Sequence, residues 1–314
     1  MADNLAENRK TVVLNPVVLN RPAVLGVGLA ALAAIGFSGK AILVKLAYVD
    51  RVDAVTLLAV RMLFSVPFFM VAGLWSLRQK HLAPLTQRDF SVILALGLIG
   101  YYLSSLLDFL GLQYISAGLE RLILFLYPTV VVILSAIIFK RPFGRREIIA
   151  LLLSYAGIAL VVMHDVKASE TGMIIGAALV FASTLTYAIY LVGAGQAIAR
   201  IGAARFTAYA MLVACAATLI QFAVTHPLSA LALPPRVYGL GIAMAIFSTV
   251  LPVFMLAASI RAIGPGHAAL IGSIGPIATI FMAHVFLGEE VSAQQIGGGL
   301  LVLIGVLIIS LAKR

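Results

Sequence analysis

The amino-acid sequence predicts an all-α integral membrane protein of about ten transmembrane helices, arranged as two inverted five-helix repeats. Three observations support this fold class. The first is composition: 62% of the 314 residues are hydrophobic and 11% are charged, whereas soluble domains carry about 25% charged residues. The second is a series of apolar segments long enough to span a bilayer, and the third is a partial repeat of the sequence. A chain this apolar requires lipid as the solvent for much of its surface.

Apolar segments of spanning length follow one another along the whole chain. A transmembrane helix needs about 20 mainly apolar residues. The segments that meet this requirement are 23–47, 53–76, 89–115, 117–139, 145–163, 172–194, 204–224, 236–258, 264–287 and 293–312. The breaks between them are short and carry charges or proline, and none is long enough to hold a soluble domain. Any activity is therefore expected within the bilayer or at its faces.

The distribution of Lys and Arg predicts the orientation of these spans. With the N-terminus in the cytoplasm, fifteen basic residues fall in inner segments and three, Arg51, Lys167 and Arg236, in outer loops. Cytoplasmic loops of membrane proteins carry such an excess of basic residues. We therefore expect a multi-pass protein of the cytoplasmic (inner) membrane with both termini cytoplasmic. The same bias accounts for the net charge of +10, so no nucleic-acid partner is expected.

The sequence partly repeats itself after 148 residues. At this offset Gly28 matches Gly176, Gly118 matches Gly266, Pro128 matches Pro276 and Gly157 matches Gly305. The offset spans five helices, an odd number, so equivalent helices are expected to cross the membrane in opposite directions. The expected organisation is a cytoplasmic tail (1–22), a first repeat (23–163), a linker (164–171) and a second repeat (172–312).

Three segments of the chain resemble EamA-type members of the drug/metabolite transporter superfamily. They are Gly118–Pro128 (GLERLILFLYP), Leu287–Gly297 (LGEEVSAQQIG) and the last span around Gly305. The resemblance covers residues 23–312 and implies that spans 3, 4, 8 and 9, with 1 and 6, surround a solute path. The first half departs from the pattern, because Arg141-Pro142 stands where the second half has Glu289-Glu290. Glu290 is expected to cap a helix or lie at an interface.

Several ionisable residues fall inside the predicted spans, where each costs at least about 2.5–3.5 kcal/mol. Lys40, Arg61, Asp108, Glu120 and Arg121 lie toward the outer half of the first repeat, and His267 and His284 lie in the ninth span. Arg61 and Arg121 are expected to pair or to extend outward, and Glu120 to favour a helix start. Two alternatives remain for Lys40. It faces the solute path and favours negatively charged substrates, or it forms an ion pair with Asp108 that locks two spans.

Polar and aromatic residues mark the candidate solute path. Beside Lys40, Asp108 and His267, the candidate lining residues are Tyr101, Tyr102, Ser105, Tyr127, Ser183, Tyr187, Ser248 and Ser273. Ordinary packing accounts for any one of them, whereas the set on facing helices predicts a polar-aromatic pocket. Pro128 and Pro276 are expected to kink the fourth and ninth spans.

The expected function is secondary transport, with export of a small metabolite or amino acid by alternating access. Efflux of lipophilic drugs is an alternative, disfavoured because Lys40 would repel a cation. An intramembrane enzyme or a non-transporting scaffold is an alternative from a different class. The sequence holds neither a phosphate-binding Gly-rich loop followed by Lys-Ser/Thr nor metal-ligand spacing. We therefore expect no catalysis, cofactor or metal. The expected partners are a small-molecule substrate and the lipid bilayer, and the expected state is a monomer or homodimer.

Overall fold

The structure, a computed structural model, describes residues 21–78, 84–138, 140, 144–168 and 172–311. The described helices are α1 (Arg21–Tyr48), α2 (Ala54–Leu77), α3 (Gln87–Gly97), η1 (Leu98–Leu103), α4 (Ser104–Gly111), α5 (Ala117–Leu124), α6 (Tyr127–Ile138), α7 (Arg145–Ala168), α8 (Met173–Ile201), α9 (Ala203–Thr225), η2 (Leu228–Leu231), α10 (Pro235–Ala245), η3 (Ile246–Val250), α11 (Leu251–Gly272), α12 (Ile274–Leu287) and α13 (Ala293–Leu311). Most of the expected N-terminal tail lies outside the described residues, as do positions 169–171 of the expected linker.

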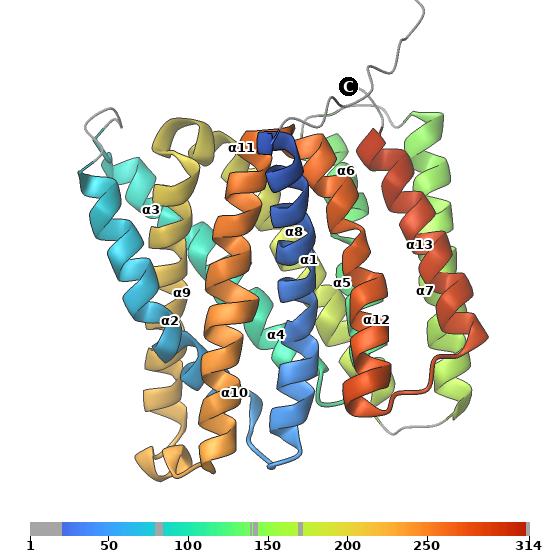
Figure 1. Ribbon diagram of the computed structural model, residues 1–314, viewed down its shortest axis with the longest axis horizontal. Coiled ribbons are helices and arrows are strands. Elements are labelled where there is room, and N and C mark those ends of the chain that lie inside the picture. Colours follow the sequence, from blue (N-terminus) through green and yellow to red (C-terminus); the bar gives the residue numbers. More distant parts are fainter. Residues whose placement is uncertain (1–20, 79–83, 139, 141–143, 169–171, 312–314) are drawn as a thin grey trace, which may run out of the picture.

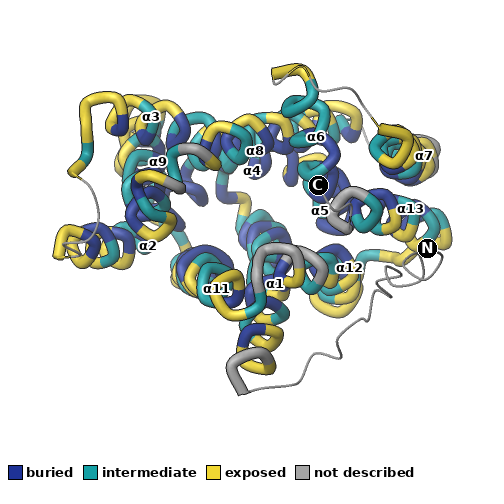
Figure 2. Tube along the Cα trace, turned by 90° about the horizontal axis from the view of Figure 1, so that it is seen from above, coloured by how far each residue is buried: buried dark blue, intermediate teal, exposed yellow. Residues whose placement is uncertain are grey.

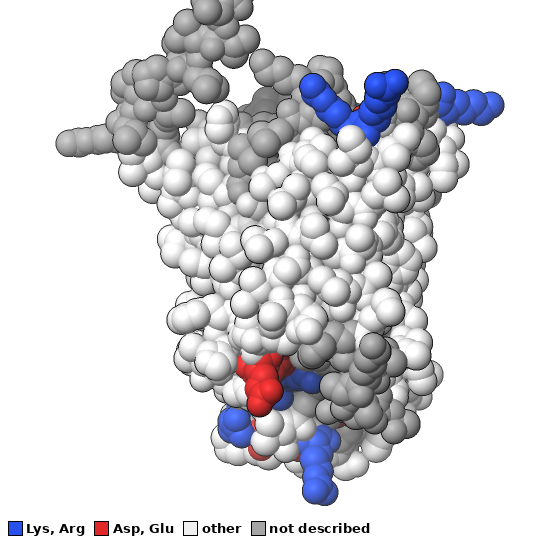
Figure 3. All heavy atoms as spheres, turned by 90° about the vertical axis from the view of Figure 1, so that its right-hand side faces the viewer, with Lys and Arg blue, Asp and Glu red and all other residues white. Residues whose placement is uncertain are grey.

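Within the described residues, eight helical segments are long and apolar enough to cross a membrane. They are Val24–Tyr48, Ala54–Leu77, Gln87–Gly111, Ala117–Ile138, Arg145–Met163, Met173–Gly195, Ala203–Thr225 and Pro235–Ile263, and Ile274–Leu287 and Ala293–Ile308 are shorter apolar helices. Figure 1 shows them as one bundle in which α1 begins and α13 ends at the same end. On the face shown in Figure 3, charged side chains gather at the two ends and leave an uncharged band between them. The chain is therefore a multi-pass membrane protein.

The fourth and ninth expected spans are interrupted shortly before a proline. Residues Phe125 and Leu126 separate α5 from α6, and Ser273 separates α11 from α12. Pro128 and Pro276 lack the amide hydrogen that would bond the carbonyl four residues earlier. Those carbonyls belong to Leu124 and Gly272, the last residues of α5 and α11. The missing hydrogen bond thus coincides with the point where each helix stops.

Residues 259–263, between the eighth and ninth expected spans, belong to α11. Gly36 of α1 faces Pro252, Gly26 faces Ile263, and Ser38 bonds Gly275. The chain therefore runs along α1 toward its first residues and then back, and the helical assignment continues through the turn between the two expected spans.

Three backbone features recur at the offset of 148 residues. The π-helical turns η1 and η3 begin at Leu98 and Ile246. The interruptions at Phe125 and Ser273 stand at the same offset. Left-handed residues follow α6 and α12, at Lys140 (φ 50°) and Gly288 (φ 68°). The same departures from regular helix therefore occupy matching places in the two halves of the chain.

The central helices α1 and α8 each pack on helices from the other half of the chain. As Figure 2 shows from above, α1 lies beside α11 and α12, and α8 lies beside α4 and α6. We call these groups the α1 layer (α1, α11, α12) and the α8 layer (α8, α4, α6); α5 contacts both. Helix α2 packs on α9, and α7 packs on α13. The two halves are thus interlocked rather than side by side.

Each π-helical turn lies against a central helix at a glycine. A Cβ atom on Gly36 of α1 would lie 2.6 Å from the carbonyl oxygen of Phe247 in η3. A Cβ atom on Gly100 of η1 would lie 2.2 Å from the Cβ of Tyr190 in α8. Real Cβ contacts are longer than this, so only glycine permits these approaches. The two central helices therefore touch the two π turns directly.

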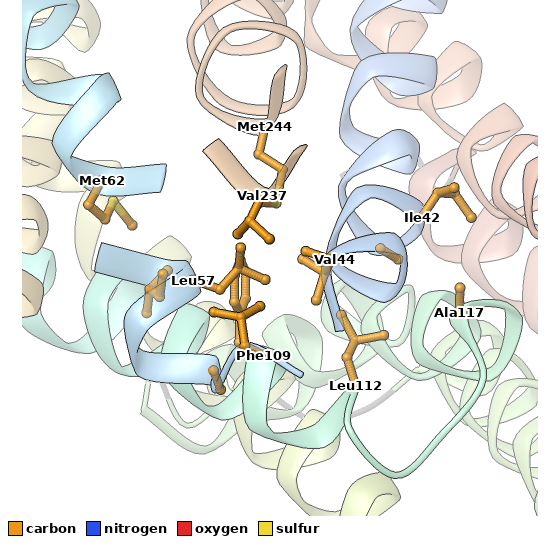
Figure 4. Packing of buried hydrophobic residues seen from close by; sticks show 14 of the residues in the cluster. Ile42, Val44, Leu57, Met62, Phe109, Leu112, Ala117, Val237 and Met244 are labelled. Carbon is orange, nitrogen blue, oxygen red and sulfur yellow. The ribbon is translucent and has the colours of Figure 1, made fainter. Parts of the chain in front are cut away.

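Buried apolar side chains close the end of the bundle opposite the described chain ends. Figure 4 shows Val44 of α1, Leu57 of α2, Phe109 of α4, Leu112 just after α4 and Val237 of α10 meeting there. All five are fully buried. They lie close to the α1–α2 turn and the start of α10. We call this set the apolar closure.

Helices α7 and α13 meet backbone to backbone. A Cβ atom on Gly157 would lie 2.5 Å from the carbonyl oxygen of Gly298, and one on Gly305 would lie 2.6 Å from that of Ala150. Replacing Gly157 and Gly305 with Ala should therefore lower the free energy of unfolding by about 1–3 kcal/mol per site, through overpacking. Thermal unfolding in detergent measures the effect. Gly28→Ala is the matched control, because a Cβ at Gly28 meets nothing within 4 Å. Equal stability of all three variants would contradict this packing.

Candidate functional site

A buried cluster of charges lies where α1, α4 and α5 meet. The Nζ atom of Lys40 lies 2.5 Å from Oδ2 of Asp108 and 3.0 Å from Oε1 of Glu120. The side chains of Asp108 and Glu120 are 3% and 0% exposed, whereas that of Lys40 is 16% exposed. The ion pair with Asp108, one of the alternatives left by the sequence, is present in the structure. Glu120 is a second partner that sequence reasoning missed.

Glu120 was expected to be mostly structural, at the start of its helix, where a carboxylate is favoured. It lies in the first turn of α5, whose N-cap is Ser116. The short turn between α4 and α5 brings this helix start back beside Asp108, so both carboxylates reach the same lysine. A charge inside a membrane bundle needs such partners. Among the described residues, no group of three or more His, Cys, Asp or Glu side chains is placed to hold a metal ion.

Arg61 is buried beside this cluster rather than extended toward the membrane surface. Its Nε donates to Oγ1 of Thr249 at 3.0 Å, and its guanidinium lies 5.5 Å from the ring centroid of Phe109. The side chain therefore joins α2 to η3 and α4. The expectation that Arg61 extends outward is wrong, because a hydroxyl and an aromatic face supply interactions inside the bundle.

Arg121 points toward the α1 layer. Its Nη2 lies 2.7 Å from the position that a Cβ on Gly275 of α12 would occupy. Oγ of Ser38 on α1 lies 2.8 Å from the carbonyl oxygen of the same Gly275. The Nε atom of Arg121 is buried and has no hydrogen-bond partner among the described residues. Helices α1, α5 and α12 thus converge at a glycine that leaves room for the guanidinium.

Three predicted tyrosines meet along one side of α8. Tyr187 contacts Tyr127 edge to face with 5.6 Å between the ring centroids, and it stacks on Tyr190 at 5.7 Å. The hydroxyls of Tyr190 and Tyr101 lie 2.9 Å apart. Tyr190 was missed by sequence reasoning, although its position three residues after Tyr187 places both on one helix face. We call Tyr101, Tyr127, Tyr187 and Tyr190 the tyrosine wall.

The serine candidates have separate surroundings. Oγ of Ser183 donates to the carbonyl oxygen of Ser104 at 2.8 Å, so it joins α8 to α4. Oγ of Ser248 lies 3.6 Å from the Cβ position of Gly39, next to Lys40, and is buried without a hydrogen-bond partner among the described residues. Ser273 lies in the interruption between α11 and α12.

The two histidines bond carbonyl groups of their own neighbourhood and not the charge cluster. His267 is exposed, and its Nδ1 lies 3.0 Å from the carbonyl oxygen of Ile263 in its own helix. Nδ1 of His284 lies 3.0 Å from the carbonyl oxygen of Glu289. Tyr102 and Ser105 are half-buried in η1 and α4. The structure therefore groups the tyrosines and the first-half charges, and it leaves the two histidines outside them.

The residue that caps a neighbouring helix is Glu289, not Glu290. The carboxylate of Glu289 accepts hydrogen bonds from the amides of Ala117 at 2.8 Å and Gly118 at 3.2 Å. A carboxylate is favoured at a helix N-terminus, where amide groups lack partners. Glu290 is exposed. The left-handed Gly288 (φ 68°) ends α12 immediately before Glu289, so the turn decides which of the two acids meets α5.

Comparisons with known proteins agree with a transporter fold. The chain is 31% identical over 288 residues to the uncharacterized transporter YcbK of Bacillus subtilis (strain 168), covering 88% of this chain and 90% of that protein. It is 28% identical over 218 residues to the uncharacterized transporter YyaM of the same organism, covering 68% and 71%. A solved crystal structure matches with a TM-score of 0.61 at 16% identity, over 90% of this chain and 95% of that one, which shows the fold alone.

The family model described as the EamA-like transporter family matches residues 24–163 and again residues 174–311. The two matches together take in both halves of the helical bundle and nearly all of the described chain. Lipid-spanning helices, buried intramembrane charges and transporter relatives therefore lead to one conclusion: this chain is a membrane transporter that belongs to the EamA-like transporter family.

Proposed function

We propose that this protein is a secondary transporter that exports a small metabolite or amino acid across the cytoplasmic membrane by alternating access. The observation that carries the proposal is the Lys40–Asp108–Glu120 cluster. Ionisable groups kept within a membrane bundle mark solute or ion pathways, since each is costly unless it serves a purpose there. The cluster joins the α1 layer to α4 and α5, which are the parts that must separate when a central path opens.

The proposed architecture is ten spans in two inverted repeats, residues 23–163 and 172–312. The backbone features recurring after 148 residues support it. The packing does so as well, because α1 contacts α11 and α12 just as α8 contacts α4 and α6. Two similar halves of opposite orientation can exchange conformations, which converts an outward-open state to an inward-open one.

The state proposed for this structure is closed toward the outside. The excess of basic residues in the segments between α2 and α3 and between α6 and α7 supports a cytoplasmic location for that end. The apolar closure lies at the opposite end. Lys40 nevertheless keeps 16% of its side chain accessible, which favours access from the cytoplasmic side.

The proposed orientation predicts that both chain ends are cytoplasmic. A green fluorescent protein fused to the C-terminus should fluoresce, and alkaline phosphatase fused at the same place should be inactive. A fusion after Leu233, in the proposed outer segment before α10, is the matched control and should give the reverse pattern. An active phosphatase at the C-terminus would contradict both the orientation and the even number of spans.

Flux in sealed vesicles tests the proposed function. Inverted membrane vesicles carrying the wild-type protein, the Lys40→Met variant or no transporter are incubated with a defined mixture of metabolites, and their contents are measured by mass spectrometry. We expect at least one solute to accumulate only in wild-type vesicles. Identical contents in all three preparations would argue against transport by this protein.

A further inference from the structure

Lys40 is already occupied by two carboxylates. Asp108 and Glu120 lie 2.5 Å and 3.0 Å from its ammonium group, and both are almost completely buried. A negatively charged solute would have to displace one of them, and neither can move into water without breaking the helix contacts around it. Lys40 therefore neutralises the protein's own acids, and another group must receive an anion.

Arg61 and Arg121 both border the Lys40–Asp108–Glu120 cluster, and both keep a buried nitrogen, Nη1 and Nε respectively, without a hydrogen-bond partner among the described residues. Arg61 donates to Thr249 and lies over the ring of Phe109. Arg121 is absent from the ion pairs of the described residues. The carboxylate of the adjacent Glu120 is directed to Lys40. A guanidinium carries five N–H donors in a planar fork that matches a carboxylate or a phosphate. Its contact with Gly275 directs this fork to the junction of the two layers.

The side chains on the α8 layer are larger than those on the α1 layer near Arg121. Tyr127 begins α6, directly after the interruption that ends the helix of Arg121, and it packs edge to face on Tyr187 of α8. At the offset of 148 residues, Tyr127 corresponds to Gly275 and Tyr187 corresponds to Gly39. The α8 layer thus presents aromatic rings where the α1 layer presents glycines. Flat or apolar bodies pack well on tyrosine rings, and opposite them Gly39 and Gly275 carry no side chain, so that Ser248 and the guanidinium of Arg121 approach the α1 layer there.

The charges near this space are predominantly positive. The first half holds Lys40, Arg61 and Arg121 against Asp108 and Glu120. The second half has neutral residues at the positions corresponding to Lys40, Asp108, Glu120 and Arg121, namely Ala188, Leu256, Ala268 and Ala269. Both acids lie within 3.0 Å of the ammonium of Lys40, and the three cations outnumber them, so an ammonium group on a solute is disfavoured beside Arg121.

We propose that Arg121 is the anion-binding residue of the solute path, and that the solute is an organic anion with a flat or apolar body. Its carboxylate or phosphate binds the guanidinium, and its body lies between the tyrosine wall and the glycines of the α1 layer. This inference rests on the proposed transport function and narrows it, because it excludes cations and disfavours zwitterions such as amino acids.

Thermal unfolding of the purified full-length protein in detergent tests the binding site without requiring flux. The probes share a phenyl ring and differ in charge: 3-phenylpropionate, phenyl phosphate, L-phenylalanine and 2-phenylethylamine, with sodium acetate as the control for charge alone. A solute that binds the folded protein raises its apparent stability. We expect stabilisation by at least one of the two ring-bearing anions, which also distinguishes carboxylate from phosphate, and none by phenylalanine, phenylethylamine or acetate.

Variants of Arg121 assign the effect to this residue. Arg121→Gln should remove the stabilisation by the anion, and Arg121→Lys, which keeps the charge but loses the fork, should weaken binding by about tenfold. Arg61→Gln is the matched control: it removes another cation of the same cluster and should keep the anion effect. Gly275→Ala is a second variant that disturbs the guanidinium but leaves every charge in place. Its Cβ would lie 2.7 Å from Nη2 of Arg121 and would displace that group. This variant should also weaken binding.

Several results would overturn the inference. They are stabilisation by phenylalanine or phenylethylamine as strong as that by the anions, an unchanged anion effect in both Arg121→Gln and Gly275→Ala, or no stabilisation by either ring-bearing anion. Flux in proteoliposomes is measured separately, so that failure of the proposed transport and failure of the proposed binding site can be told apart. Anion binding without flux would contradict the proposed transport and leave the site intact. Flux of zwitterions or cations without anion binding would support transport and reject the role of Arg121.

Discussion

Lys40→Met should abolish transport and lower the free energy of unfolding by about 3–5 kcal/mol, because the buried carboxylates of Asp108 and Glu120 lose the ammonium group that lies within 3.0 Å of both. Flux in proteoliposomes and thermal unfolding in detergent measure the two effects. Arg200→Gln is the matched control. It also removes a cation from an ion pair, with Asp89, but the Arg200 side chain is 46% exposed. Exposed pairs contribute little, so this variant should stay close to the wild type.

The triple variant Lys40→Met, Asp108→Asn, Glu120→Gln separates the two roles of the cluster. It removes both acids together with the lysine that neutralised them, so neither carboxylate is left as a buried charge and its stability should return toward that of the wild type. Its flux should remain low, because Lys40 is the member of the cluster that keeps accessible surface. Near-normal flux in the triple variant would show that the cluster only holds α1, α4 and α5 together.

Glu289→Gln should open the outer end of the bundle more often. The carboxylate caps α5 from the turn after α12, and loss of a helix cap costs about 1 kcal/mol, which is roughly a fivefold change in the ratio of two conformations. A cysteine at Leu57, in the apolar closure, reports this opening when Cys215 is replaced by Ala. Labelling by a membrane-impermeant maleimide from the outside should increase about fivefold.

Glu290→Gln is the matched control for this prediction, because the side chain is the same and the residue is exposed. It should leave the labelling rate unchanged. An equal increase in both variants would mean that the general loss of negative charge, and not the cap on α5, controls access. The residue 148 positions before Glu289 is Arg141, so a matching acidic cap is not available by sequence at the other end.

The lipid-spanning segments were predictable because hydropathy and length are local properties of the chain. The prolines were predictable for the same reason, since the bond that Pro128 or Pro276 removes depends only on the residue itself. The pairing of Glu120 with Lys40 was not predictable, because it depends on how α4 and α5 turn relative to α1. Likewise, Arg61 is placed by Thr249, which lies far away in the sequence.

Sequence reasoning also could not decide which of two adjacent acids, Glu289 or Glu290, contacts another helix. Both acids were visible in the sequence, and a cap or interface was the expected role. Which one reaches α5 depends on the left-handed conformation of Gly288, and the angle at which the chain leaves that turn cannot be derived from residue types alone. Tyr190, in contrast, was within reach of sequence reasoning, because helical spacing places it beside Tyr187.

The two π turns give the bundle a means of rotation without displacement of its ends. A π turn holds one residue more than an α-helical turn. If that extra residue shifts by one position along the helix, the segment it passes rotates by about 100°, the angle between successive α-helical residues. In η1 this rotation would swing Tyr101 relative to Tyr190, and in η3 it would swing Thr249 relative to Arg61. Gly36 brings α1 against η3, and Gly100 brings η1 against α8. A rotation at η3 would therefore displace α1, and a rotation at η1 would displace α8.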